Sequence, residues 1–345
     1  MARQVSSTTT QIALLGGETL LGRDLQDVLQ SRGTGVTIRT YSSSGEGNFG
    51  EQEGEPVYVE PLDAKTVSSS LAVVVTGSPE GADKAYQLAK ETGGKVKLID
   101  CTGYLESRSE AKIVAPLLEE PKASDWLLVL AHPIASALAL VLKRLASYRQ
   151  IERAVINIFE PASERGQRGI SELHQQTTGL LAFKSLNKEV YDAQVSFNLL
   201  SQYGEEAPVQ LSTVEQRIER HLSMLLKGYA NGEPIPVASL RLIQAPVFHG
   251  YSISLWVEFD SQAASSVNVR TLGETLASAQ IEVRSAGEEP PTGVGAAGQS
   301  GLIAGDIRSD RNNAQAVWLW VVLDNLRVTA DAAADVMRGL GMGSQ

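Results

Sequence analysis

Thiols, imidazoles and long apolar segments are scarce in this chain. It has 1 cysteine and 4 histidines in 345 residues. A single cysteine excludes an internal disulfide and fits a reducing cytoplasm, which we expect as the location. No apolar run reaches the roughly 18 residues that a membrane helix needs, so no membrane partner is expected. The opening MARQVSSTTT lacks the apolar core of a signal peptide and is expected to fray.

Positive charge is also in deficit. The chain has 30 lysines and arginines against 40 acidic residues, a net charge of −10. General nucleic-acid binding requires a basic face, so this balance argues against it. The hydrophobic content of 43% and charged content of 20% are ordinary for a globular protein. The length allows two domains with a sizeable core.

The N-terminal part of the sequence predicts a Rossmann-like sheet. An apolar run at 12–15, a turn at Gly16 and Gly17, and leucines at helical spacing up to Leu29 predict a strand, a glycine turn and a helix. Further strands are expected at 35–41, 71–75, 96–100 and 126–130. A helix is expected at 80–92 and a loop at 42–55. Strands that alternate with helices predict a parallel α/β sheet.

The rest of the chain predicts an α+β domain with a mostly antiparallel sheet. Helices are expected at 134–148, 169–183, 211–226 and 267–280, and strands at 154–159, 194–200, 240–247, 252–259 and 316–323. A mobile loop is expected at 286–301 and a closing helix at 328–340. The predicted domains are 1–131, with a helix returning from 325–345, and 132–324.

Several short motifs follow one another in the order of a known family. They are GGETLLG (16–22), LIDCT (98–102), HPIAS (132–136), FEPASERGQRGISEL (159–173), QAPVFHGYS (244–252), AGDIRSD (304–310) and DNLR (324–327). In that order and spacing they resemble the aspartate-semialdehyde dehydrogenase family over nearly the whole chain. The resemblance implies a dinucleotide-binding domain, a dimerisation domain whose sheet forms a homodimer, and an NADP-dependent enzyme of amino-acid biosynthesis.

The family's functional positions carry other residues here. The resemblance places the catalytic cysteine at Ala135, the acid–base histidine at Tyr251, the thioester-placing glutamine at Glu160 and the substrate-holding arginine at Gln244. Alanine has no nucleophile, and a phenol with a reference pKa of about 10 is a poor proton shuttle. Gln244 replaces a cation by a neutral amide, and Glu160 replaces an amide by an acid. Both changes disfavour the binding of an anionic substrate.

The cofactor loop is weakened as well. Thr19 stands where the family has its central glycine, so its Cβ would crowd a pyrophosphate, and Glu18 adds a repelling charge. The family's arginine for a 2′-phosphate falls on Ser42 or Ser43, with Arg39 as a substitute, and no acid ends the second strand to hold a free ribose. The fold implies NADP or NAD, and the candidate cofactor-binding residues are Gly16, Gly17, Glu18, Thr19, Leu20, Leu21, Gly22, Arg39, Ser42, Ser43 and Gly77.

Other groups offer alternative chemistry. His249 lies two residues before Tyr251, so on a strand both would face one side and His249 would be a substitute base. Ser136 with His249 and Glu258 suggests a hydrolase set, although no GxSxG elbow is present. Cys101 is interpreted as a small core residue rather than a relocated nucleophile. No metal site is expected, because His174 and His221 lack a paired ligand at metal spacing.

The leading hypothesis is a member of this family that has lost acyl-transfer catalysis. It would act as a scaffold, a regulator or a partner of an active paralogue. The alternative is an NAD(P)-dependent oxidoreductase in which Tyr251 or His249 handles the proton. The least favoured reading is a serine hydrolase.

Overall fold

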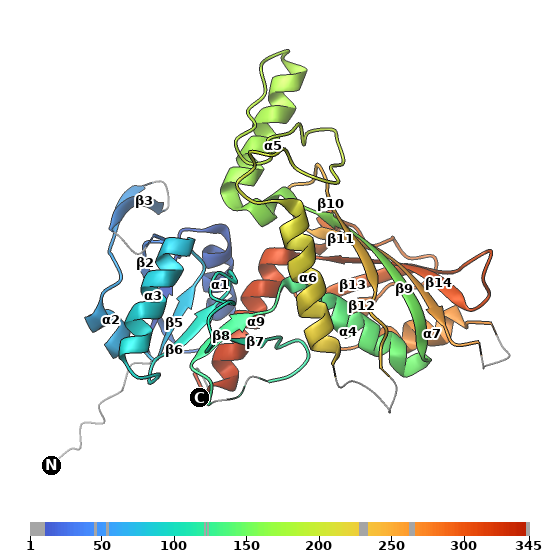
Figure 1. Cartoon of the computed structure of the whole chain (residues 1–345), viewed down its shortest axis with the longest axis horizontal. Coiled ribbons are helices and arrows are strands. Elements are labelled where there is room, and N and C mark those ends of the chain that lie inside the picture. Colours follow the sequence, from blue (N-terminus) through green and yellow to red (C-terminus); the bar gives the residue numbers. More distant parts are fainter. Residues whose placement is uncertain are drawn as a thin grey trace. The chain divides into compact units, whose positions relative to one another are not determined.

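The computed structural model describes residues 11–44, 47–52, 55–120, 122, 124–227, 234–261 and 266–342. The described residues form two compact units, one within 1–131 and 329–345 and the other within 132–328 (Figure 1). The predicted frayed tail, MARQVSSTTT, lies outside the described residues. Within the described part of the chain, no helix has the length and apolarity to cross a membrane.

The first unit is built on a parallel sheet of six strands, which confirms the Rossmann-like prediction. The strand order is β2-β1-β5-β6-β8-β7, and every pair is parallel. The strands are β1 (Gln11–Leu15), β2 (Thr37–Tyr41), β5 (Ala72–Val75), β6 (Lys97–Asp100), β7 (Lys112–Val114) and β8 (Leu127–Leu130). β5 and β8 are buried along their whole length, as expected of strands covered on both faces.

Helices cover both faces of this sheet. They are α1 (Leu20–Ser31), α2 (Ala64–Ser69), α3 (Pro79–Glu91) and α9 (Asn325–Gly339). Alternate residues of β1 enter different cores, because Ile12 packs with residues of α1 and α9 whereas Ala13 packs with residues of α2 and α3. Arg32, after α1, binds Asp331 and Asp335 of α9 at 2.7 and 2.8 Å.

The predicted loop at 42–55 is partly wrong. It contains β3 (Asn48–Gln52), which pairs antiparallel with β4 (Glu55–Val59) in a two-stranded sheet of its own. The serine- and glycine-rich composition indicated turns correctly, but it did not predict the pairing of β3 with β4. Backbone pairing defines these strands, and it requires no apolar alternation.

The second unit is built on a mixed sheet of six strands. The order is β10-β9-β11-β14-β13-β12; the outer pairs β10–β9 and β12–β13 are parallel and the inner pairs antiparallel. The strands are β9 (Ile151–Glu160), β10 (Ser239–Gln244), β11 (Tyr251–Phe259), β12 (Ile281–Val283), β13 (Leu302–Ser309) and β14 (Ala316–Leu323). β11 alternates between buried and half-buried residues, so one face is apolar.

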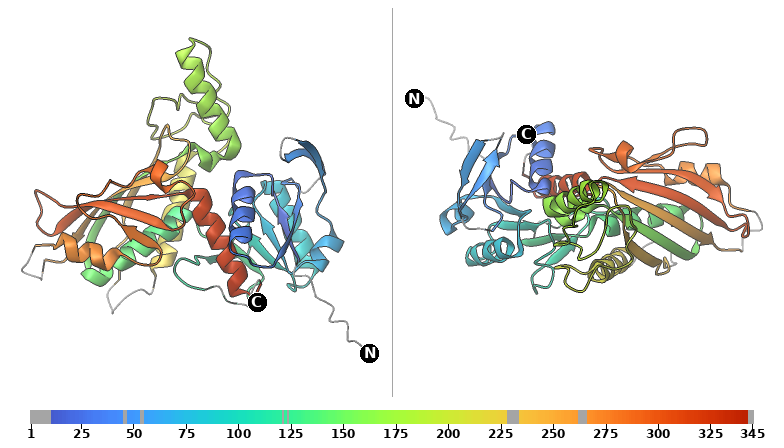
Figure 2. Two further views of the ribbon diagram at one scale, coloured as in Figure 1. Left: turned by 180° about the vertical axis from the view of Figure 1, so that it is seen from behind. Right: turned by 90° about the horizontal axis from the view of Figure 1, so that it is seen from above.

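Helices of the second unit gather on that apolar face (Figure 2). They are α4 (Pro133–Tyr148), α6 (Leu211–Leu226) and α7 (Val269–Leu276), whereas α5 (Gly166–Leu181) extends away from the sheet and α8 (Gly293–Ala296) contacts β14. A short 3-10 helix, η1 (Ala162–Arg165), joins β9 to α5. α4 is the most apolar of them, with a nearly continuous buried run from Ile134 to Leu142.

Three predicted segments differ in this unit. Residues 194–200 form no strand. The Gln176 side chain accepts the backbone N–H groups of Val195 and Ser196, at 2.8 and 3.2 Å, and only Leu200 pairs with β10, through a single bridge to Gln244. The helix expected at 267–280 is α7, which starts after the capping side chain of Asn268 and ends at Leu276. The predicted loop at 286–301 contains the single turn α8.

Candidate functional site

The ends of three neighbouring strands bring together the family positions Glu160, Gln244 and Tyr251. Gln244 is the register partner of Glu160 in the parallel pair β10–β9. β11 starts at Tyr251, beside the end of β9. All three side chains are fully buried. The motif spacing therefore predicted residues that do meet at one edge of the sheet.

Glu160 is the centre of this cluster. Its Oε1 accepts from Arg165 Nη2 at 2.5 Å and from Tyr203 Oη at 3.1 Å, and its Oε2 accepts from Tyr251 Oη at 3.1 Å. Tyr203 Oη also lies 2.6 Å from Gln244 Oε1. The Gln244 amide donates to the carbonyl oxygens of Glu160 and Ala245 at 2.9 and 2.8 Å. The polar groups of the cluster are thus largely bonded to one another.

Burial sets the charges in this cluster. Removal of the Glu160 carboxyl from water raises its pKa to about 7, although the nearby Arg165 charge favours ionisation. Burial, and then the negative charge of Glu160, raise the pKa of Tyr251 well above its usual value. Tyr251 therefore keeps its proton near neutrality and donates a hydrogen bond to Glu160. It is a poor acid–base group for that reason.

A second cluster surrounds the start of α4. His132 caps the helix, since its Nδ1 accepts from the Ile134 backbone N–H at 3.3 Å. Its proton therefore sits on Nε2, which lies 3.5 Å from Glu164 Oε1. Burial lowers the pKa of His132, so the imidazole is neutral near pH 7. The His132 backbone N–H donates to His221 Nδ1 at 3.0 Å.

Ala135 lies in the first turn of this helix and is fully buried. Its methyl group stands where the resemblance implies a thiolate, so the helix start carries no sulfur nucleophile. Ser136 is buried as well, and its backbone N–H donates to the His132 carbonyl.

Four residues of these clusters were not predicted from the sequence: His132, Glu164, Arg165 and Tyr203. A signal was present for His132, which stands in HPIAS, three residues before Ala135. Arg165 stands in the motif FEPASERGQRGISEL and lies in η1, whereas Tyr203 lies in an irregular segment where no periodic pattern marks it. Their contacts with Glu160 depend on the tertiary fold.

The prediction for His249 is wrong in its geometry. His249 lies in a bend before β11, and Gly250 has φ +81°, so the chain turns between His249 and Tyr251. The two side chains therefore do not share a strand face.

The hydrolase set is not assembled either. Glu258 lies at the opposite end of β11 from Tyr251, roughly 20 Å away at about 3.3 Å per residue. There Glu258 binds Arg153 at 3.1 Å and Asn313 at 2.8 Å. Cys101 packs against the core of the first unit, where burial raises the pKa of its thiol. Among the described residues, no group of three or more histidine, cysteine or acidic side chains is placed to hold a metal ion.

Thr19 forms the hydrogen bonds that hold the glycine loop between β1 and α1. Thr19 caps α1, and its hydroxyl accepts from the Gly22 N–H at 3.0 Å and lies 2.8 Å from the Gly16 carbonyl. Gly16 has φ +90°, and a Cβ there would lie 2.7 Å from Gly77 N. A Cβ at Gly22 would lie 2.1 Å from Gly16 O. These glycines allow the backbone segments of the loop to pack closely.

The other cofactor candidates surround this loop. Gly17 is buried beside Thr40, and Leu20 and Leu21 are half-buried in the first turn of α1. Ser42 and Ser43 follow β2; Ser42 is fully buried and Ser43 partly so. Arg39 lies on β2 and is exposed.

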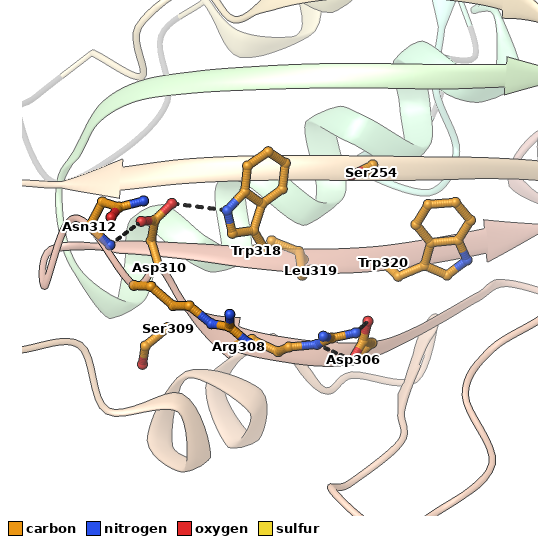
Figure 3. Close-up of a pocket in the computed structure, with 10 residues that line it drawn as sticks. Ser254, Asp306, Arg308, Ser309, Asp310, Asn312, Trp318, Leu319 and Trp320 are labelled. Carbon is orange, nitrogen blue, oxygen red and sulfur yellow. Dashed lines mark hydrogen bonds and ion pairs between the residues drawn. The ribbon is translucent and has the colours of Figure 1, made fainter.

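The exposed face of the second unit's sheet carries indole side chains. Trp256 and Trp318 are register partners on β11 and β14, and each donates Nε1 to Asp310 Oδ2 at 2.9 Å. Trp318 is 41% exposed. Figure 3 shows Trp318 and Trp320 along a depression of about 380 Å³, with the ion pair of Arg308 and Asp306 beside it. Partly exposed aromatic side chains of this kind are enriched at protein interfaces.

Comparison with known proteins gives the same family along most of the chain. The family model "Semialdehyde dehydrogenase, dimerisation domain" matches residues 142–328. An aspartate-semialdehyde dehydrogenase of Rickettsia bellii is 26% identical over 330 residues, 92% of this chain and 93% of its own. A USG-1 protein homolog of Pseudomonas aeruginosa is 29% identical over 263 residues, 75% of each chain.

Solved structures agree with the fold. A probable aspartate-semialdehyde dehydrogenase of Pseudomonas aeruginosa has a TM-score of 0.77 and 26% identity, with 95% of this chain and 96% of that chain covered. The aspartate semialdehyde dehydrogenase of Candida albicans with NADP has a TM-score of 0.66 and 13% identity, with 97% and 99% covered.

Proposed function

The chain belongs to the semialdehyde dehydrogenase family, and we propose that it is a member without acyl-transfer catalysis that acts by binding. Its role is that of a scaffold, a regulator or a partner of an active paralogue. The observation that carries the proposal is Ala135, an alanine buried at the start of α4 where the family's nucleophile is expected.

The surrounding residues support this proposal. The Arg165 guanidinium already has Glu160 as its counter-ion, and the Gln244 amide is bonded to two carbonyl oxygens. An anionic substrate would have to compete with Glu160 for the cation. Because Tyr251 keeps its proton near neutrality, the proton transfers of acyl chemistry also lack a suitable group.

The direct test is an activity assay. Purified protein is incubated with aspartate semialdehyde, phosphate and either NADP or NAD, beside an active aspartate-semialdehyde dehydrogenase as the positive control. We expect neither NADPH nor NADH formation above the rate without protein. Turnover above that background would contradict the proposal.

An oxidoreductase with altered chemistry is the second candidate. The intact strand, glycine turn and helix of the first unit favour it, because hydride transfer requires a dinucleotide but no cysteine. It predicts binding of NAD or NADP, which isothermal titration calorimetry measures directly. No heat of binding at millimolar dinucleotide would exclude this candidate.

We also propose a homodimer through the exposed face of the second sheet. The family match covers a dimerisation domain. The half-exposed indoles of Trp256, Trp318 and Trp320 lie on that face. Aromatic side chains of this kind are enriched at protein interfaces.

A further inference from the structure

Glu18 brings a carboxylate to the end of β2, a strand that has no acidic residue of its own. It lies in the loop between β1 and α1, and its Oε1 accepts from the Ser43 backbone N–H at 2.8 Å. Ser43 follows the end of β2 at Tyr41, and β2 pairs with β1 in parallel register. The carboxylate therefore lies at the carboxyl end of the second strand, although it comes from the glycine loop.

This place decides which ribose a Rossmann-like fold accepts. An acidic residue there hydrogen-bonds the free 2′-hydroxyl of NAD, whereas an arginine nearby accommodates the 2′-phosphate of NADP. Ser42 and Ser43 stand where the resemblance implies that arginine. Glu18 instead brings an anion to this position, and an anion does not fit a 2′-phosphate.

The carboxylate is held in place by its surroundings. The Ser43 carbonyl accepts from the Ser78 N–H at 3.0 Å. A Cβ at Gly77 or Gly81 would lie 2.5 or 2.1 Å from that carbonyl oxygen, so the two segments are in close contact. The Ser43 N–H that binds Glu18 is thus part of a tightly packed turn.

Binding of the Ser43 N–H explains only one of the two oxygens of the Glu18 carboxylate. One oxygen is enough to hold the Ser43 N–H. The other, Oε2, is buried and has no hydrogen-bond partner among the described residues. A buried acceptor without a donor costs about 1–3 kcal/mol, whereas a ribose hydroxyl would satisfy it.

We infer that Glu18 makes the first unit select an adenine nucleotide with a free 2′-hydroxyl over one with a 2′-phosphate. Its Oε2 accepts from the ribose hydroxyl, and its charge repels the phosphate dianion. The inference rests on the proposed binding role and is independent of whether the protein catalyses any reaction.

The test compares two probes that differ only in the 2′-phosphate. The affinities of 5′-AMP and adenosine 2′,5′-bisphosphate are measured by isothermal titration calorimetry, and then those of NAD and NADP. We expect 5′-AMP and NAD to bind at least about tenfold more tightly than their 2′-phosphorylated counterparts. Glu18→Gln keeps an oxygen for the Ser43 N–H and removes the charge, so it should reduce that ratio severalfold or more.

Glu91→Gln is the matched control. It removes the same charge from an exposed site at the end of α3 and should leave the ratio unchanged. Tighter binding of the 2′-phosphorylated probes by the unmodified protein, as expected if Arg39 held the phosphate, would overturn the inference. So would an unchanged ratio in Glu18→Gln, or no binding of 5′-AMP and NAD. Absence of catalysis alone would leave it standing.

Discussion

Under the proposed function, Ala135 and Tyr251 account for different parts of the missing acyl-transfer reaction. Ala135 lacks an atom that can attack, whereas Tyr251 has a proton that its surroundings hold in place through burial and Glu160. Restoring one residue therefore does not restore the other function. The proposal therefore predicts that no single substitution at these positions produces activity.

Ala135→Cys tests this view. We expect the thiol variant to stay inactive, because its proton transfers still lack a histidine and Gln244 still lacks the arginine charge. The combined variant with Tyr251→His, Glu160→Gln and Gln244→Arg should be at least about 100-fold more active, since general acid–base catalysis contributes about 10²–10⁴-fold. The rates of NADH and NADPH formation from aspartate semialdehyde and phosphate measure the activity of both variants.

Ala137→Cys serves as the control for a thiol introduced elsewhere in the same helix. Ala137 is buried in α4 like Ala135. The Ala137→Cys variant should be inactive both alone and together with the three other substitutions. Activity of Ala135→Cys alone that equals the combined variant would show that Tyr251 does not limit the chemistry.

Glu160 should make stability depend on pH. Its pKa is raised from the ordinary 4.5 to about 7 in the folded protein, so the folded state binds more protons than the unfolded state between these values. The free energy of unfolding should therefore fall as the pH rises from about 4.5 to 7, by up to about 3 kcal/mol from this group. At higher pH, the contribution should be constant.

The contribution of Glu160 is the difference in the free energy of unfolding between the unmodified protein and Glu160→Gln, measured by urea unfolding at each pH. His132, with its lowered pKa, has the opposite sign near pH 6 and cancels in this difference. Glu152→Gln, an exposed change on the same strand, is the control and should show no slope. A flat difference for Glu160→Gln between pH 5 and 7 would contradict the buried-carboxyl assignment.

At the scale of elements, the start of α1 depends on the Thr19 hydroxyl. Thr19→Ala removes the cap on the Gly22 N–H and should lower the free energy of unfolding of the first unit by about 1 kcal/mol. Thr19→Ser keeps the hydroxyl and should cost much less. Urea unfolding followed by circular dichroism measures both, and equal losses in the two variants would show that the cap is unimportant.

The elements that the sequence predicted best are those with a strong apolar period. β14, α6 and the buried strands β5 and β8 were all predicted, because burial on one or both faces dictates their composition. The hairpin β3–β4 was missed, since its pairing requires no such period. The segment 194–200 has β-branched and apolar residues, but the side chain of Gln176 fixes it in turns.

The candidate site divides in the same way. That Glu160, Gln244 and Tyr251 lie together could be predicted from the motifs, because they end or begin adjacent strands. Their partners Arg165 and Tyr203 come from η1 and an irregular segment, and only the tertiary fold brings them to the buried carboxylate.

At the scale of the whole molecule, the proposed homodimer should depend on the indoles of the second sheet. Trp318→Glu places a charge beside Asp310 on the exposed face and removes a large apolar side chain. A stable interface buries about 1,600 Å² in total and excludes unpaired charges from its centre. We therefore expect the unmodified protein to be a dimer and Trp318→Glu a monomer in light scattering after size exclusion.

Leu181→Glu provides the matched control, because it introduces the same charge at a 71% exposed leucine at the end of α5, away from the sheet. It should remain dimeric, and both variants should keep the circular dichroism of the parent. The midpoint of thermal unfolding should rise with protein concentration for the parent and for Leu181→Glu but not for Trp318→Glu, since only dimers gain stability by mass action. A dimer that survives Trp318→Glu would place the interface elsewhere, and a monomeric parent would remove the proposal altogether.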